Sequence, residues 1–299
     1  MNDIVTLDAS TNYAVMAKAM GIATESSAVE RKSNSLARLR IHHTPLMGQA
    51  EVKGKMVNME VVAAGTYKLE IPDGPTYYAP KAIIRPFLQR FMYKRFIKGQ
   101  GDQPNRYVKS VMADNLNIDL KDNAGTFNCG KAAGYIADFK ALPEKMQDLI
   151  KQIKRVRVVL GTVELIGATD ELGNAVDVES TPFIWEIDNR DAFKTVGEVF
   201  ARYTKLRLLL PHHKIKSTTE ERKLPNGGSF FLPLTTLDVT TTFDISTEDQ
   251  NTFADFMGWV TNYNTYIMTM WKQNSTKDDD DDVDVDTVND FIDIDSEVA

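Results

Sequence analysis

Basic and aromatic side chains are interleaved between residues 77 and 113, a combination suited to holding a polyanion by non-covalent contacts. Residues 81–113 contain eight lysines or arginines and one acid, Asp102, in a chain with more acids than bases. Aromatic rings stack on bases, and Lys and Arg contact phosphates, when a protein holds a nucleic-acid single strand. The stacking candidates are Tyr77, Tyr78, Phe91, Tyr93 and Tyr107. The phosphate-binding candidates are Arg85, Arg90, Lys94, Arg95, Arg106 and Lys109.

Two further basic clusters follow along the chain. Lys154, Arg155 and Arg157, preceded by Lys151, lie at an expected helix–strand junction, and they could extend the same groove. The basic cluster between residues 214 and 223 also contains two glutamates, which reduce its net positive charge. For any single aromatic residue a place in the core is the better expectation, and each of these two clusters is a little more typical of plain surface. The skew of the whole 77–109 segment nevertheless favours binding.

The last 22 residues have a different composition, with ten Asp, one Glu and no basic residue. Like charges repel and there is little apolar surface to bury, so we expect a disordered interaction tail over residues 278–299. A few apolar residues near its end are typical of a docking peptide, although a purely solubilising tail is the plainer alternative. The expected partner-binding residues are Asp278, Asp279, Asp280, Asp281, Asp282, Asp290, Phe291, Ile292 and Asp293.

Charge accounting links the tail to the body. The whole chain carries −7, and the tail contributes eleven acids, so residues 1–277 carry +4. A mildly basic body with an acidic tail can bind a polyanion and let its own tail compete for that surface.

Other chemistries have little support in the sequence. The one cysteine, Cys129, excludes an internal disulfide and is typical of a reducing compartment. Two His–His pairs without metal-ligand spacing, and the lack of phosphate-loop or nucleophile motifs, predict no metal, no cofactor and no enzymatic activity. No apolar run approaches a membrane span and the first residues lack a signal peptide, so we expect a cytoplasmic protein.

The elements that would position these residues form an α+β body with a β-rich, OB-like barrel core. We expect an N-terminal arm with a short helix over residues 1–35, a body over 36–277 and the tail over 278–299. Alternation of apolar and polar residues predicts strands within 36–43, 51–71, 81–98, 116–122, 154–168, 181–187 and 207–246. Helices are predicted over 143–153, 190–206 and 247–274, the last of them amphipathic.

This order of parts resembles the single-stranded DNA-binding proteins of T4-like bacteriophages, which have an OB fold. Short echoes are AIIRPFL at 82–88, NCGK at 128–131 and IKRVRVVLGTVEL at 153–165. The resemblance implies cooperative coating of single strands, an arm that contacts the next subunit, and a tail that recruits replication and recombination proteins in the host cytoplasm. The T4-type proteins also hold a structural zinc through several Cys and a His, whereas this chain has only Cys129.

The resulting hypothesis is a non-enzymatic, sequence-tolerant single-stranded DNA-binding protein of phage replication, recombination and repair. Two alternatives stay open from the sequence. One is a virion or scaffold protein whose β body assembles with itself. The other is a metal-dependent nuclease built from scattered carboxylates.

Overall fold

The computed structural model describes residues 35–52, 55–99, 104–131, 136, 138–224 and 227–275. The chain divides into two units, Met1–Ser35 and Leu36–Ala299. All the elements below belong to the second unit. The expected N-terminal helix and the acidic tail lie outside the described residues.

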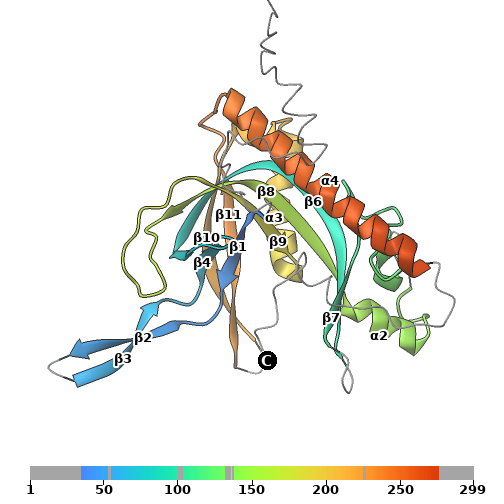
Figure 1. Cartoon of the computed structure of the whole chain (residues 1–299), viewed down its shortest axis with the longest axis horizontal. Coiled ribbons are helices and arrows are strands. Elements are labelled where there is room, and N and C mark those ends of the chain that lie inside the picture. The colour runs from blue at the N-terminus through green and yellow to red at the C-terminus, as the bar shows by residue number, and fades with distance from the viewer. Residues whose placement is uncertain are drawn as a thin grey trace, which may run out of the picture. The chain divides into compact units, whose positions relative to one another are not determined.

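One large mixed sheet forms the body (Figure 1). Its nine strands follow the order β11-β10-β6-β8-β9-β1-β4-β5, and β7 pairs with the far end of β6. All pairings are antiparallel except β1 with β9. The strands are β1 (Ala37–His42), β4 (Thr66–Glu70), β5 (Thr76–Ala79), β6 (Lys81–Ile97), β7 (Arg106–Lys109), β8 (Ile153–Ile166), β9 (Thr181–Ile187), β10 (Ile215–Lys223) and β11 (Ser229–Leu237).

Strands β6 and β8 form the longest pair in this sheet. Its register is interrupted between Pro86 and Leu88, where Phe87 is an extra residue on β6. Such a bulge reverses the side-chain alternation on either side of it. Gly161 faces the bulge, and a side chain there would lie 2.2 Å from the Arg85 carbonyl oxygen, so only glycine fits.

One face of the sheet packs against helix α3 (Arg190–Lys205), and we call it the α3 face. The helix begins as expected, because the Asn189 side chain accepts hydrogen bonds from the backbone N–H groups of Asp191 and Ala192. Trp185 and Tyr67 meet edge to face in this core, at 6.1 Å between ring centroids. The Tyr67 hydroxyl hydrogen-bonds with Ser217 of β10, so β4 and β10 approach each other although they are not neighbours in the sheet.

The opposite face, which we call the α4 face, is partly covered by α4 (Thr247–Ser275), which runs across β6 in Figure 1. Phe256 and Val260 of the helix pack on Phe87, Met92 and Leu160. The helix start is held by reciprocal hydrogen bonds between Ser246 and Asp249. Trp271 near its end donates a hydrogen bond to the Thr126 carbonyl, which ties the end of the helix to the 108–131 segment.

A third small core lies beneath residues 108–131 and includes the buried Cys129. The Asp122 carboxylate is its centre, because it accepts hydrogen bonds from the backbone N–H groups of Ala124, Thr126 and Cys129 and from the Thr126 hydroxyl. The prediction of a strand over 116–122 is wrong. This stretch is a loop with isolated bridges, followed by the short 3-10 helix η1 (Asn128–Gly130), because side-chain hydrogen bonds take the place of a ladder.

The remaining elements lie at the margins. Strands β2 (Leu46–Val52) and β3 (Lys55–Val62) form a separate hairpin that extends from the sheet in Figure 1. Helix α2 (Glu144–Gln152) precedes β8, and the 3-10 helix η2 (Leu210–His212) precedes β10. The α+β class is confirmed, while the sheet is open at β11 and β5 and does not form a closed barrel. None of the helices in the described residues has the length and apolar character of a membrane span.

Candidate nucleic-acid interface

The predicted binding residues divide between the two faces of the sheet, because successive side chains of a strand point to opposite faces. On β6 and β7, the members on the α4 face are Arg85, Arg90, Lys94, Tyr107 and Lys109, together with Lys154 of β8. The members on the α3 face are Phe91, Tyr93, Arg95 and Arg106, together with Arg155 and Arg157. The bulge turns Phe87 to the face opposite Phe91, where its ring centroid lies 5.9 Å from that of Phe256 of α4.

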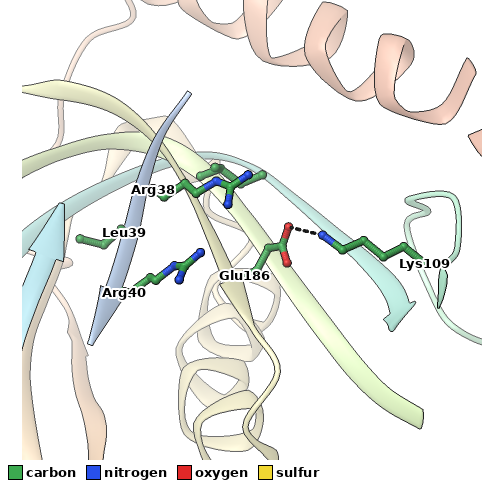
Figure 2. A pocket seen from close by; sticks show the side chains of 6 residues that line it. Arg38, Leu39, Arg40, Lys109 and Glu186 are labelled. Atoms are coloured by element: carbon green, nitrogen blue, oxygen red, sulfur yellow. Dashed lines mark ion pairs between the residues drawn. The ribbon is translucent and has the colours of Figure 1, made fainter. Parts of the chain in front are cut away.

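The α4 face contains a small hollow centred on Glu186 of β9, which we call the Glu186 hollow (Figure 2). Its lining residues are Arg38, Leu39, Arg40, Lys109, Ile184 and Glu186. Arg38 and Arg40 reach toward the carboxylate from β1, and Lys109 reaches it from β7. The hollow has a volume of about 40 Å³, which is room for a few water molecules or one small anionic group.

Cations outnumber carboxylates around this hollow. The Glu186 oxygens lie 3.8 Å from Lys109 Nζ and 3.7 Å from Lys94 Nζ. Burial alone would raise the pKa of Glu186, but the charges of Lys109, Lys94, Arg38 and Arg40 lower it to about 2. A carboxylate with so low a pKa stays ionised at every physiological pH, and its single charge offsets only part of the charge of the four cations.

The pairs beside the hollow are more nearly balanced. Lys68 Nζ of β4 lies 2.7 Å from Glu70, which also lies 3.5 Å from Arg40 Nε. Lys154 Nζ pairs with Asp188 at 2.9 Å. Within the described part of the chain, the lining of the hollow itself has three cations and one carboxylate.

Two aromatic rings flank the cations of the hollow. Tyr107 lies beneath Lys94, with Nζ 4.7 Å from the ring centroid, and it is half-buried. Phe96 is 42% exposed and tilts against Tyr107 at 5.0 Å between centroids. The strand end thus presents accessible ring surface next to positive charge, which are the two features that hold single strands.

Two arginines and two tyrosines of the predicted set make structural contacts away from the hollow. Arg85 forms a two-point ion pair with Asp249 of α4 and also donates to the carbonyls of Pro211 and Asp244. Arg90 pairs with Asp114 at 2.8 Å. These engagements argue against phosphate binding by either arginine, because both guanidinium groups already have acceptors.

The other two are the tyrosines of β5, which occupy packing positions. Tyr77 packs against the α3-face core. Tyr78 is buried against His42, and burial, with the charges of Glu171 and Glu70, raises its pKa to about 12. A ring enclosed in this way has no free surface for a base.

The α3 face holds the other group of predicted residues. Arg157 is 8% exposed and lies against the rings of Phe91, Phe193 and Phe200, while the exposed Arg155 also contacts Phe193. Tyr93 is buried, and its hydroxyl donates to the Leu116 carbonyl, so this ring does not offer a stacking surface.

Sequence reasoning missed Arg38, Arg40 and Glu186. The first two stand at alternate positions of the strand 36–43, and an ordinary solvated strand edge has the same pattern. Only the pairing of β1 beside β9 brings them to Glu186. Among the described residues, no group of three His, Cys, Asp or Glu side chains could hold a metal ion.

Comparison with protein-family models, with curated proteins and with solved structures finds no match to this chain.

Proposed function

We propose that this chain is a sequence-tolerant single-stranded DNA-binding protein whose strand lies on the α4 face of the sheet. The observation that carries this proposal is the Glu186 hollow, where Arg38, Arg40, Lys94 and Lys109 surround one carboxylate. Cations in excess over acids attract a polyanion and release its counterions on binding.

The mode of binding follows from the residues at the hollow. The two arginines of β1 offer forked N–H donors to phosphate oxygens, and Lys94 and Lys109 offer point charges. Phe96 and Tyr107 supply rings for stacking, which every base accepts through its π face. Neither kind of contact reads base edges, so the affinity depends little on sequence.

The resemblance to phage single-stranded DNA-binding proteins of the OB type belongs to the same proposal. Curling of the sheet, which brings Tyr67 to Ser217, supports an opened OB-like body. The Asp122 hydrogen bonds hold the loop around Cys129, in place of the zinc that this family uses. The acidic tail then recruits replication and recombination proteins in the host cytoplasm through Phe291 and Ile292.

The test is a salt titration of binding to fluorescent oligo-dT, with the full chain and with a chain lacking residues 278–299. The affinity falls steeply with salt. The slope of log Kobs against log salt decreases by about 0.7 in Arg40→Ala, because this variant has one phosphate-binding cation fewer. Lys205→Ala is the matched control, since Lys205 is an exposed cation at the far end of α3. No binding at low salt by the tail-less chain would refute the proposal.

A second candidate, an assembling structural protein, is favoured by one observation. The β2–β3 hairpin exposes Met47, Met56, Val57 and Met59, and apolar side chains gathered on one projecting element mark an interaction surface. Filaments or particles that form with rising protein concentration and without nucleic acid would support this candidate.

A further inference from the structure

A second group of cations lies on the α3 face, behind the Glu186 hollow. Its members are Arg95, Arg155, Arg157 and Lys131, with Phe91 and Phe193 as neighbouring rings. Lys94 and Lys154 of the α4 face are adjacent in sequence to Arg95 and Arg155, so the same two strands carry both groups.

Arg157 is the unusual member of this group. Its guanidinium carbon lies 4.6 Å from the centroid of Phe193 and 5.0 Å from that of Phe91, and its Nε is buried without a hydrogen-bond partner in the described chain. Burial lowers its pKa to about 10. A charge withdrawn from water in this way costs free energy unless an anion approaches it.

The fold makes room for this guanidinium. Gly197 of α3 faces it, and a side chain there would lie 2.6 Å from Arg157 Nη2. Phe193 is contacted by both Arg155, at 5.4 Å, and Arg157, so two positive charges share one ring. Within the described residues, Arg155 forms no ion pair or hydrogen bond that would offset this.

Arg95 and Lys131 add charge to the same region. Arg95 Nε is likewise buried without a partner among the described residues. Burial and the charge of Arg155 lower the pKa of Lys131, which lies 5.1 Å over the Tyr93 ring. Like charges gathered on apolar rings form a site that an anionic group would stabilise.

We propose that Arg155, Arg157 and Arg95 form a second phosphate site, which takes the phosphodiester backbone of a strand that has already bound the α4 face. The route between the faces passes the Arg106 end of β7, where Arg106 is exposed, because Asn123 occupies the outer edge of this strand at Tyr107 and Lys109. The bound nucleic acid therefore wraps around the edge of the sheet at β7 and places one base on Phe193. This inference rests on the proposed function, because its ligand is the same strand.

Length dependence tests the second site. A strand of about 5 nucleotides covers one face, while about 16 nucleotides reach both faces. Arg155→Glu is expected to weaken binding of the longer oligo-dT by about tenfold and to leave the shorter one unchanged, as measured by anisotropy with the full chain. Lys205→Glu is the matched control and alters both affinities equally and slightly.

A reporter on the α3 face gives a second readout that does not depend on the charge change. Phe193→Trp adds a fluorophore whose emission is expected to be quenched by the longer oligonucleotide only. The second site is overturned if Arg155→Glu binds the longer strand as the wild type does, or if both lengths lose affinity equally. Absence of any binding by the wild type would instead overturn the proposed function, and this site with it.

Discussion

Arg85 of β6 and Asp249 in the first turn of α4 face each other in a two-point ion pair, with Nη1–Oδ1 at 2.9 Å and Nη2–Oδ2 at 3.1 Å. Burial raises the pKa of Asp249, but hydrogen bonds from Ser246 and from Arg85 outweigh it and hold the pKa below its usual value. The pair fastens the long helix across β6, which carries more of the predicted nucleic-acid-binding residues than any other strand.

We expect Arg85→Ala to lower the free energy of unfolding by about 3 kcal/mol, because it leaves a partly buried carboxylate without its partner. Chemical denaturation measures this change. Lys151→Ala, which breaks an exposed pair with Asp148, is the control and costs less than about 0.5 kcal/mol. A similarly small loss in the free energy of unfolding for both variants would show that the Arg85–Asp249 pair does not fasten α4 to the sheet.

A substitution that removes the charge of Arg85 separates structure from binding. If Arg85 is engaged by Asp249 and not by phosphate, Arg85→Gln keeps the slope of log affinity against log salt, whereas Arg40→Ala reduces it. Fluorescence anisotropy with oligo-dT measures both slopes. A slope reduced by Arg85→Gln would return this arginine to the phosphate-binding set.

Glu186 connects stability to pH. Its pKa is about 2 in the folded chain and about 4.3 in an unfolded one, so its ionised form stabilises the fold above about pH 4 and this contribution is lost as the pH falls toward 2. Glu186→Gln is therefore expected to cost about 1 kcal/mol at pH 7 and progressively less below about pH 4. Urea titrations of both chains across this range measure the difference; a constant difference would contradict the assignment.

Glu186→Gln has a second consequence at the surface. Removing the carboxylate raises the positive charge of the hollow, so binding of oligo-dT at low salt is expected to tighten by about threefold. Asp148→Asn, which removes a carboxylate on α2, serves as the control for a general change in net charge. Weaker binding by Glu186→Gln would show that the carboxylate mainly positions the lysines.

The Asp122 hub makes a prediction about Cys129. Asp122→Ala removes four hydrogen bonds from the 108–131 loop, and it should destabilise the protein by about 3 kcal/mol. Burial, together with the charge of Asp122, raises the pKa of the thiol, which is 1% exposed, so iodoacetamide reacts slowly with the wild type. Much faster alkylation of the variant is expected; equal rates would mean that the loop does not depend on Asp122.

Removal of residues 278–299 tests the tail. The tail carries eleven acids and the rest of the chain is net positive, so deletion should tighten oligo-dT binding by about tenfold at low salt. The difference should vanish at about 1 M salt, where screening reduces the range of such interactions to a few ångströms. Unchanged affinity at low salt would show that the tail does not compete with DNA for the body, and recruitment of partner proteins would be its one remaining proposed role.

Local chemistry was enough to predict many elements. Short-range patterns predict the helices over 143–153 and 190–206 and the strand over 154–168, and the structure contains them as α2, α3 and β8. The 116–122 stretch does not form the strand that its alternation predicts. The same alternation of residue types occurs whether the backbone N–H groups bond to a neighbouring strand or to the side chains of Asp122 and Asn128.

The sequence by itself determined the composition of the candidate site: a basic–aromatic segment, a positive body and an acidic tail. Tertiary structure alone decided which of those side chains act together. The bulge at Phe87 reverses the side-chain alternation of β6. Asp249 of α4 forms an ion pair with Arg85. Strand β1, which lies beside β9, brings Arg38 and Arg40 to Glu186. Alternation along a strand specifies that neighbouring residues point to opposite faces of the sheet. Which other residues lie on each face depends on the order of the strands, and that order is set by contacts between residues distant in sequence.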